Sequence, residues 1–187
     1  MIKFCGVKNK NDINKAILSN SKFIGFNFYY KSIRYIGNDF LNLLKFIPKN
    51  IFKVALFVNN NYNEINKLKS FFDFFQFHGD ESFIFCESFK KKYIKTIKIY
   101  DKKNFNMFYN SKYFYSFLID KKNIFYGGNG KIYNHFKILR KKFFISGGID
   151  INNYKKITLI SSLLNLDICS SIEQNDIKNI KKMINFY

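Results

Sequence analysis

The chain has 187 residues, of which 47% are hydrophobic, and this length and composition indicate one folded domain and exclude a disordered chain. The net charge of +19 is typical of nucleic-acid-binding proteins. Nearly all of it comes from lysine, in a chain where 120 residues are Lys, Asn, Ile, Phe or Tyr, all encoded by A/T-rich codons. A bias in base composition therefore explains the charge, although it would still attract an anionic substrate. The apolar runs are too short to cross a bilayer and no leader peptide is evident, so we expect neither a membrane nor a nucleic acid as partner.

Eight strand-like runs alternate with polar segments of helical spacing. The runs are Lys3–Val7, Phe23–Phe28, Lys53–Asn59, Phe74–His78, Thr96–Tyr100, Tyr115–Asp120, Phe143–Ser146 and Leu166–Ser170. Such an α/β alternation without tandem hairpins predicts parallel strands, and the closed solution is a single (βα)8 TIM barrel over residues 1–187. The chain is short for this fold, so its helices and loops must be short. An open doubly wound sheet is the alternative, but its glycine-rich fingerprint is missing after the first run.

Three helices can be placed from capping residues and apolar spacing. We expect Asn11-Asp12 to cap the first, Asn63 to cap the second, and Asn175-Asp176 to precede a third whose apolar face begins at Ile177. The segment 101–112 has little helical pattern.

In a barrel of this kind the active site lies at the carboxyl ends of the strands. That rule selects Cys5, Arg34, Asn59, His78, Asp101, Asp120, Gly147-Gly148 and Ser170-Ser171, together with the turn Gly127-Gly128-Asn129-Gly130. The two pairs of small residues would follow the seventh and eighth strands, where barrels of this type bind phosphate through backbone N–H groups. A Gly-Gly pair elsewhere would be read as an ordinary turn.

Cys5 and Asp120 each have a structural interpretation besides the catalytic one, whereas Arg34 suggests a binding role. Cys5 alone would be a small buried hydrophobe, because a thiol with a pKa of about 8.5 needs a cationic or amide-rich setting to act as a base. Asp120 ends an apolar strand, where a carboxylate is costly, but it could also cap a helix. Arg34 is one of two arginines in a lysine-rich chain, which suggests a bidentate carboxylate or phosphate partner. His78 reads as a hydrogen-bonded residue at a strand end.

The cysteines number three, and none lies in a CxxC pair. An odd number without metal-ligand spacing favours reduced thiols over a disulfide framework or a zinc site. We therefore expect a cytoplasmic protein, without a metal or another cofactor.

Eight segments in this order resemble the phosphoribosylanthranilate isomerase family of tryptophan biosynthesis. They are Lys3–Gly6, Gly25–Tyr29 with Lys31–Tyr35, Lys53–Asn59, Gln76–Glu81, Leu118–Asp120, Gly127–Lys131, Ser146–Ile149 and Asp167–Glu173. The resemblance implies a cofactor-free Amadori rearrangement of N-(5-phosphoribosyl)anthranilate to the 1-deoxyribulose 5-phosphate. It implies Asp120 as the general acid that opens the ribose ring, and Cys5 as the base that removes the C2 proton.

The same resemblance assigns the substrate contacts. Arg34 would face the anthranilate carboxylate, while Gly128, Gly148 and Ser170 would bind phosphate. We also expect substrate contacts from His78, Gly147, Asp167 and Ser171, although the family usually has glycine where Ser171 stands. The partner would be a small phosphorylated molecule, and the protein a monomer or a homodimer.

Three other functions stay open. A catalytically decayed barrel would keep the fold without activity, although Cys5, Arg34 and Asp120 are all present. A basic nucleic-acid-binding protein would gather its lysines on one face. A related isomerase of histidine biosynthesis would be expected to carry an aspartate in place of Cys5.

Overall fold

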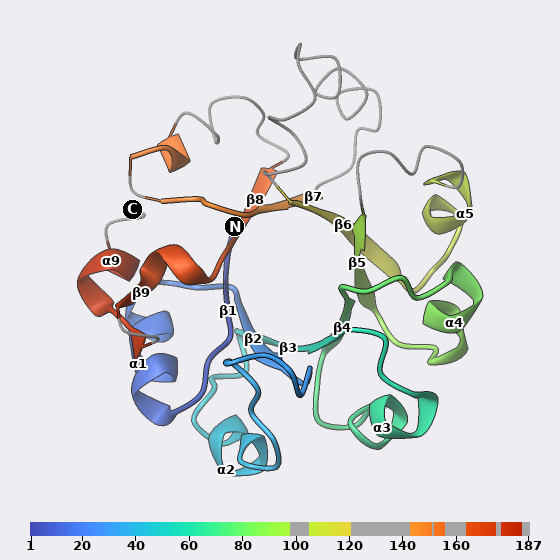
Figure 1. Cartoon of the computed structure of the whole chain (residues 1–187), viewed down its shortest axis with the longest axis horizontal. Helices are drawn as coiled ribbons and strands as arrows, with labels where there is room; N and C mark the ends of the chain where they lie inside the picture. The colour runs from blue at the N-terminus through green and yellow to red at the C-terminus, as the bar shows by residue number, and fades with distance from the viewer. Residues whose placement is uncertain (98–104, 121–142, 151, 156–163, 175–176, 185–187) are drawn as a thin grey trace.

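The computed structural model describes residues 1–97, 105–120, 143–150, 152–155, 164–174 and 177–184. Eight parallel strands form a closed barrel in chain order, seen end-on in Figure 1. They are β1 (Ile2–Cys5), β2 (Phe23–Asn27), β3 (Phe52–Phe57), β4 (Phe74–Phe77), β5 (Tyr93–Ile97), β6 (Phe114–Asp120), β7 (Phe143–Ser146) and β8 (Leu164–Ile168). The last strand pairs with the first, with Lys3 opposite Asp167 and Phe4 opposite Ile168. The predicted (βα)8 barrel is therefore confirmed.

Short helices surround the ring of strands (Figure 1). They are α1 (Lys10–Leu18), α2 (Phe40–Leu44), α3 (Tyr62–Lys67), α4 (Phe83–Ser88), α5 (Phe105–Tyr109) and α9 (Ile180–Ile184), and a 3-10 turn, η1 (Ser170–Ile172), follows β8. A two-stranded antiparallel hairpin, β9 (Glu173–Gln174) and β10 (Ile177–Lys178), precedes α9. The longest of these helices has nine residues, as the shortness of the chain predicted. Within the described residues, no helix combines the length and apolar character that a membrane span requires.

Two predicted helix starts were wrong by two residues. The side chain of Asn9, not of Asn11 or Asp12, caps α1 by accepting from the Asp12 backbone N–H at 2.9 Å. Asn61, not Asn63, caps α3 in the same way. Both segments are rich in asparagine, so composition could not tell which residue reaches the N–H three positions later.

Strand boundaries also differ from the prediction: the first ends at Cys5 rather than Val7, and the eighth spans Leu164–Ile168 rather than Leu166–Ser170. The fifth strand begins at Tyr93 and not at Thr96, because Tyr93 and Ile94 are fully buried and continue the pairing with β4. Ile177 begins β10 rather than the last helix, which starts at Ile180. In addition, α5 forms in a segment with little helical pattern.

The barrel interior is filled at one level by apolar side chains from six strands. They are Phe23, Val54, Phe74, Ile94, Leu118 and Phe144. Because side chains alternate along a strand, the next inward-facing positions lie two residues later, towards the carboxyl ends. There the sequence changes to Gly25, Leu56, Gln76, Thr96, Asp120 and Ser146. An apolar floor therefore supports a layer that is polar apart from Gly25 and Leu56, at the end of the barrel where sites of this fold form.

Candidate active site

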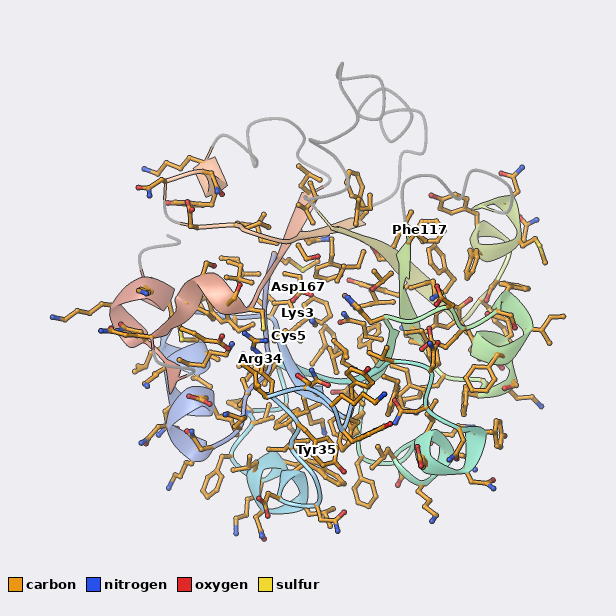
Figure 2. All side chains as sticks on the ribbon, viewed as in Figure 1. Lys3, Cys5, Arg34, Tyr35, Phe117 and Asp167 are labelled. Atoms are coloured by element: carbon orange, nitrogen blue, oxygen red, sulfur yellow. The ribbon has the colours of Figure 1, made fainter. Side chains whose placement is uncertain are left out.

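Lys3 and Cys5 alternate onto the inner face of β1, and both are buried. The Lys3 ammonium lies 2.8 Å from Asp167 Oδ1 on β8. Burial alone would lower the pKa of Lys3, but the charges of Asp167 and Cys5 outweigh it and raise that pKa. Figure 2 shows Lys3, Cys5 and Asp167 together inside the ring, with Arg34 beside them. The lysine therefore stays charged next to the thiol.

A glycine on the neighbouring strand leaves room for this thiol. Gly25 pairs with Cys5 across β1 and β2. A Cβ atom at Gly25 would stand 2.8 Å from Cys5 Sγ and 3.3 Å from Lys3 Cε. A larger residue at position 25 would therefore push the thiol and the ammonium group out of place.

Cys169, which follows β8 directly, is the neighbour of Cys5 across the strand pair. Its thiol donates to the Cys5 carbonyl oxygen at 3.3 Å. A hydrogen bond with Cys169 lowers the pKa of the Cys5 thiol to about 6, while burial opposes this shift and the charge of Lys3 adds to it. The same hydrogen bond, followed by burial, raises the pKa of Cys169. The surroundings of the two thiols therefore favour the ionised form of Cys5 and the neutral form of Cys169.

Arg34 makes a bidentate ion pair within the protein. Its Nε donates to Glu173 Oε1 at 2.8 Å and its Nη2 to Glu173 Oε2 at 2.5 Å. The buried Lys178 binds the same Glu173 at 2.6 Å and the Cys169 carbonyl at 3.0 Å. The carboxylate partner predicted from the rarity of arginine is therefore Glu173. The β9–β10 hairpin holds this guanidinium beside Cys169.

Gly6 allows Arg34 to approach the end of β1. It has a φ of +75°, and a Cβ atom there would lie 2.5 Å from Arg34 Cδ. The Arg34 side chain thus packs directly against the backbone of Gly6, where β1 ends.

The loops after β7 and β8 lie next to each other. Gly147 and Gly148 have φ angles of +81° and +61°, and a Cβ atom at Gly148 would contact nothing within 4 Å. The hydroxyl of Ser171 donates to the Ile149 carbonyl, which ties the two loops together. Ser170 and Ser171 begin η1. The described residues thus leave space beside the backbone of Gly148.

The other predicted positions are spread around the rim. His78 follows β4, is exposed, and has its Nδ1 3.0 Å from Thr96 Oγ1. Asp120 is the last residue of β6 and pairs in register with Ser146 of β7. The side chain of Asp120, and the whole of the Gly127–Gly130 turn with Gly128, lie outside the described residues. Among His, Cys, Asp and Glu side chains of the described part, no group of three could hold a metal ion.

Sequence reasoning assigned no role to three residues that contact the predicted site. Cys169, Glu173 and Lys178 bind one another, Arg34 and the Cys5 carbonyl. The alignment of β8 with β1 was the available signal, because it places residue 169 next to residue 5. Nothing in the sequence pattern indicated the hairpin that carries the other two.

The family comparison covers nearly the whole chain. The sequence model described as "N-(5'phosphoribosyl)anthranilate (PRA) isomerase" matches residues 2–187. The chain belongs to this family. A relative named N-(5'-phosphoribosyl)anthranilate isomerase, from Marinomonas sp. (strain MWYL1), is 37% identical over 101 residues, which are 52% of this chain and 49% of the relative. The chain thus spans about half the length of the curated relatives it matches.

Solved structures of phosphoribosylanthranilate isomerases share the fold. The crystal structure from Thermotoga maritima has a TM-score of 0.83 and 26% identity, over 99% of this chain and 95% of that chain. A crystal structure in complex with reduced 1-(o-carboxyphenylamino)-1-deoxyribulose 5-phosphate has the same TM-score and coverage at 23% identity. The family resemblance inferred from the sequence is therefore confirmed.

Proposed function

We propose that this chain catalyses the isomerisation of N-(5'-phosphoribosyl)anthranilate in tryptophan biosynthesis. The observation that carries the proposal is the buried Cys5 thiol at the carboxyl end of β1, placed beside Cys169 and the Lys3–Asp167 pair, a setting that lowers its pKa. A general base is most effective when its pKa lies near the working pH. A family member has been crystallised with a reduced carboxyphenylamino-deoxyribulose phosphate, which fits the substrate class.

The mechanism follows from an acid and a base acting at two points of one sugar. Asp120 protonates the ring oxygen of the ribose, so that the ring opens to a protonated Schiff base. The Cys5 thiolate then removes the proton from C2. The electron pair of the broken C2–H bond moves towards the Schiff-base nitrogen and gives an enol-amine. This species tautomerises to the ketone. Each positioned proton transfer contributes roughly 10²–10⁴-fold to the rate, and the reaction needs no cofactor.

The remaining residues would hold the two charged ends of the substrate. Gly147, Gly148, Ser170 and Ser171, with Gly128, would offer N–H and O–H donors to the phosphate. At the opposite end, Arg34 would bind the anthranilate carboxylate, donating to it in addition to, or in place of, Glu173.

Two further assignments complete the proposal. Asp167 acts by holding Lys3 next to the thiol, and His78 contacts the substrate from the rim. Since the cysteines of the described chain are free, we place the protein in the reducing cytoplasm.

The test is the loss of anthranilate-type fluorescence when purified protein is added to freshly prepared phosphoribosylanthranilate. The wild type should accelerate the decay, and Cys5→Ala and Asp120→Asn should each reduce kcat by at least about 10²-fold. Circular dichroism would show that both variants stay folded. A wild type that leaves the spontaneous rate unchanged would contradict the function, whereas wild-type turnover in either variant would contradict that residue's role.

A further inference from the structure

Gln76 is a fully buried glutamine whose side-chain amide has no hydrogen-bond partner. Its exposed fraction is 0%, and neither Oε1 nor Nε2 is bonded in the described structure. Buried polar groups in native proteins are nearly always paired, because desolvating an unpaired amide costs free energy. An amide left in this state therefore requires an explanation.

The alternation of β4 places Gln76 inside the barrel. Phe75 and Phe77 flank it, and both rings pack on the outer face against Phe89, each with centroids 5.7 Å apart. Phe74, two residues earlier, belongs to the apolar floor. Gln76 is therefore the next inward-facing residue towards the carboxyl ends of the strands, which is the end that carries Cys5.

A second unpaired polar atom lies in the same layer. The Oγ of Ser146 on β7 is buried without a partner. It stands two residues after Phe144 of the floor and pairs in register with Asp120. The charged inward positions of β1 and β8 are by contrast paired, Lys3 with Asp167 at 2.8 Å. The unpaired groups are thus a glutamine on β4, across the ring from that ion pair, and a serine on β7, the strand that pairs with β8.

We infer that Gln76 is a substrate-binding residue whose amide contacts hydroxyl groups of the sugar chain during isomerisation. The inference rests on the proposed function. An amide offers a donor at Nε2 and an acceptor at Oε1, which matches two neighbouring hydroxyls, each able to donate and accept. Ser146 Oγ, in the same layer, would form a hydrogen bond with another hydroxyl group of the ligand. The free-energy cost of burying the unpaired amide is offset when the ligand binds.

The test replaces Gln76 by methionine, which keeps the length and removes the polar atoms. In the ligand-free protein, Gln76→Met should leave Tm equal or higher, because no unpaired amide remains buried. It should lower kcat/KM about tenfold or more. The rise in Tm produced by reduced 1-(o-carboxyphenylamino)-1-deoxyribulose 5-phosphate should shrink in parallel. Gln76→Leu is the second variant should the first fail to fold.

Ser19→Ala is the matched control. Ser19 Oγ is also fully buried and unpaired, but it lies just after α1, at the opposite end of the barrel. Its removal should leave kcat/KM and the ligand-induced rise in Tm at the wild-type values.

The outcomes separate this inference from the proposed function. Equal ligand-induced rises in Tm in wild type and both Gln76 variants, or no rise in wild type, would overturn the inference. A smaller rise in the variants would support it even if the wild type failed to isomerise the substrate, a failure that would overturn only the proposed function. A purely structural amide would change the Tm of the ligand-free protein and nothing else.

Discussion

Opposing influences act on the ionisation of Cys5. Burial favours the neutral thiol, whereas the hydrogen bond from Cys169 and the charge of Lys3 favour the thiolate, and the pKa settles at about 6. Since only the thiolate accepts a proton, kcat/KM should rise as pH increases through this value and then level off. The same titration controls alkylation of the thiol.

We predict that Cys169→Ala moves the titration of Cys5 to higher pH, because the thiolate loses its hydrogen-bond donor. Iodoacetamide labelling followed by peptide mass spectrometry would give the midpoint, near about pH 6 in the wild type. Cys86 is an internal control, because burial raises its pKa to about 12 and it should stay unlabelled. An unchanged midpoint in the variant would show that Cys169 does not lower the pKa of Cys5.

At this scale the sequence indicated which side chains are able to act as an acid, a base or a binding group, but not the environment of each. Cys5 was selected because it ends a strand at a glycine. In the structure this glycine, Gly6, contacts the side chain of Arg34. Its pKa depends on Cys169, which is 164 residues away, and no local pattern carries that information.

At the scale of elements, the β9–β10 hairpin fixes the loop that follows β2. Glu173 accepts from both Arg34 and Lys178, and its side chain is only 7% exposed. Burial alone would raise the pKa of Glu173, but the hydrogen bonds from Arg34 and Lys178 lower it overall. A carboxyl whose folded pKa is depressed stabilises the protein above its ordinary pKa, and this contribution is lost as pH falls towards the lowered value.

Glu173→Gln should therefore be strongly destabilising, because it leaves the buried Lys178 without its counter-charge. Losing one partner of a buried pair costs about 3–5 kcal/mol, so Tm should fall by about 6–20 °C for a chain of this size. Thermal unfolding at pH 7 would measure the change. Glu64→Gln, which alters an exposed carboxylate of α3, is the control and should change Tm by little. Similar values for both variants would show that the hairpin contact is weak.

The strands could be predicted from the sequence because each repeats the same signal, an apolar run that ends in a polar or small residue. The fifth was placed three residues late because the segments on both sides of Ile97 alternate equally well, and only pairing with β4 decides between them. The hairpin could not be predicted, because two strands of two residues each carry too little pattern.

At the scale of the whole molecule, the buried Lys3–Asp167 pair joins the first strand to the last. Lys3→Met should destabilise the protein by about 3–5 kcal/mol, because Asp167 would remain buried and unpaired. The double variant Lys3→Met/Asp167→Leu should recover most of this loss, since apolar replacements for buried pairs are often neutral or stabilising. Urea unfolding of both proteins would test this. Equal losses in the two variants would mean that packing, and not charge, makes the difference.

The closed barrel was predictable because eight similar units in a short chain leave few other arrangements. The charge of +19, in contrast, did not help to predict the fold, because lysines are spread along the whole chain.

The pairing of β1 with β8 also sets the order in which the protein can be completed. Met1 and Lys3 bind Asn165 and Asp167, each 164 residues further along the chain. During synthesis the first strand is therefore made long before its second neighbour exists, and its edge stays unpaired until the eighth strand emerges. Contacts this distant in sequence form slowly. The ring consequently cannot close before the eighth strand has been made, and until then the growing sheet exposes an edge at which aggregation competes with completion of the ring.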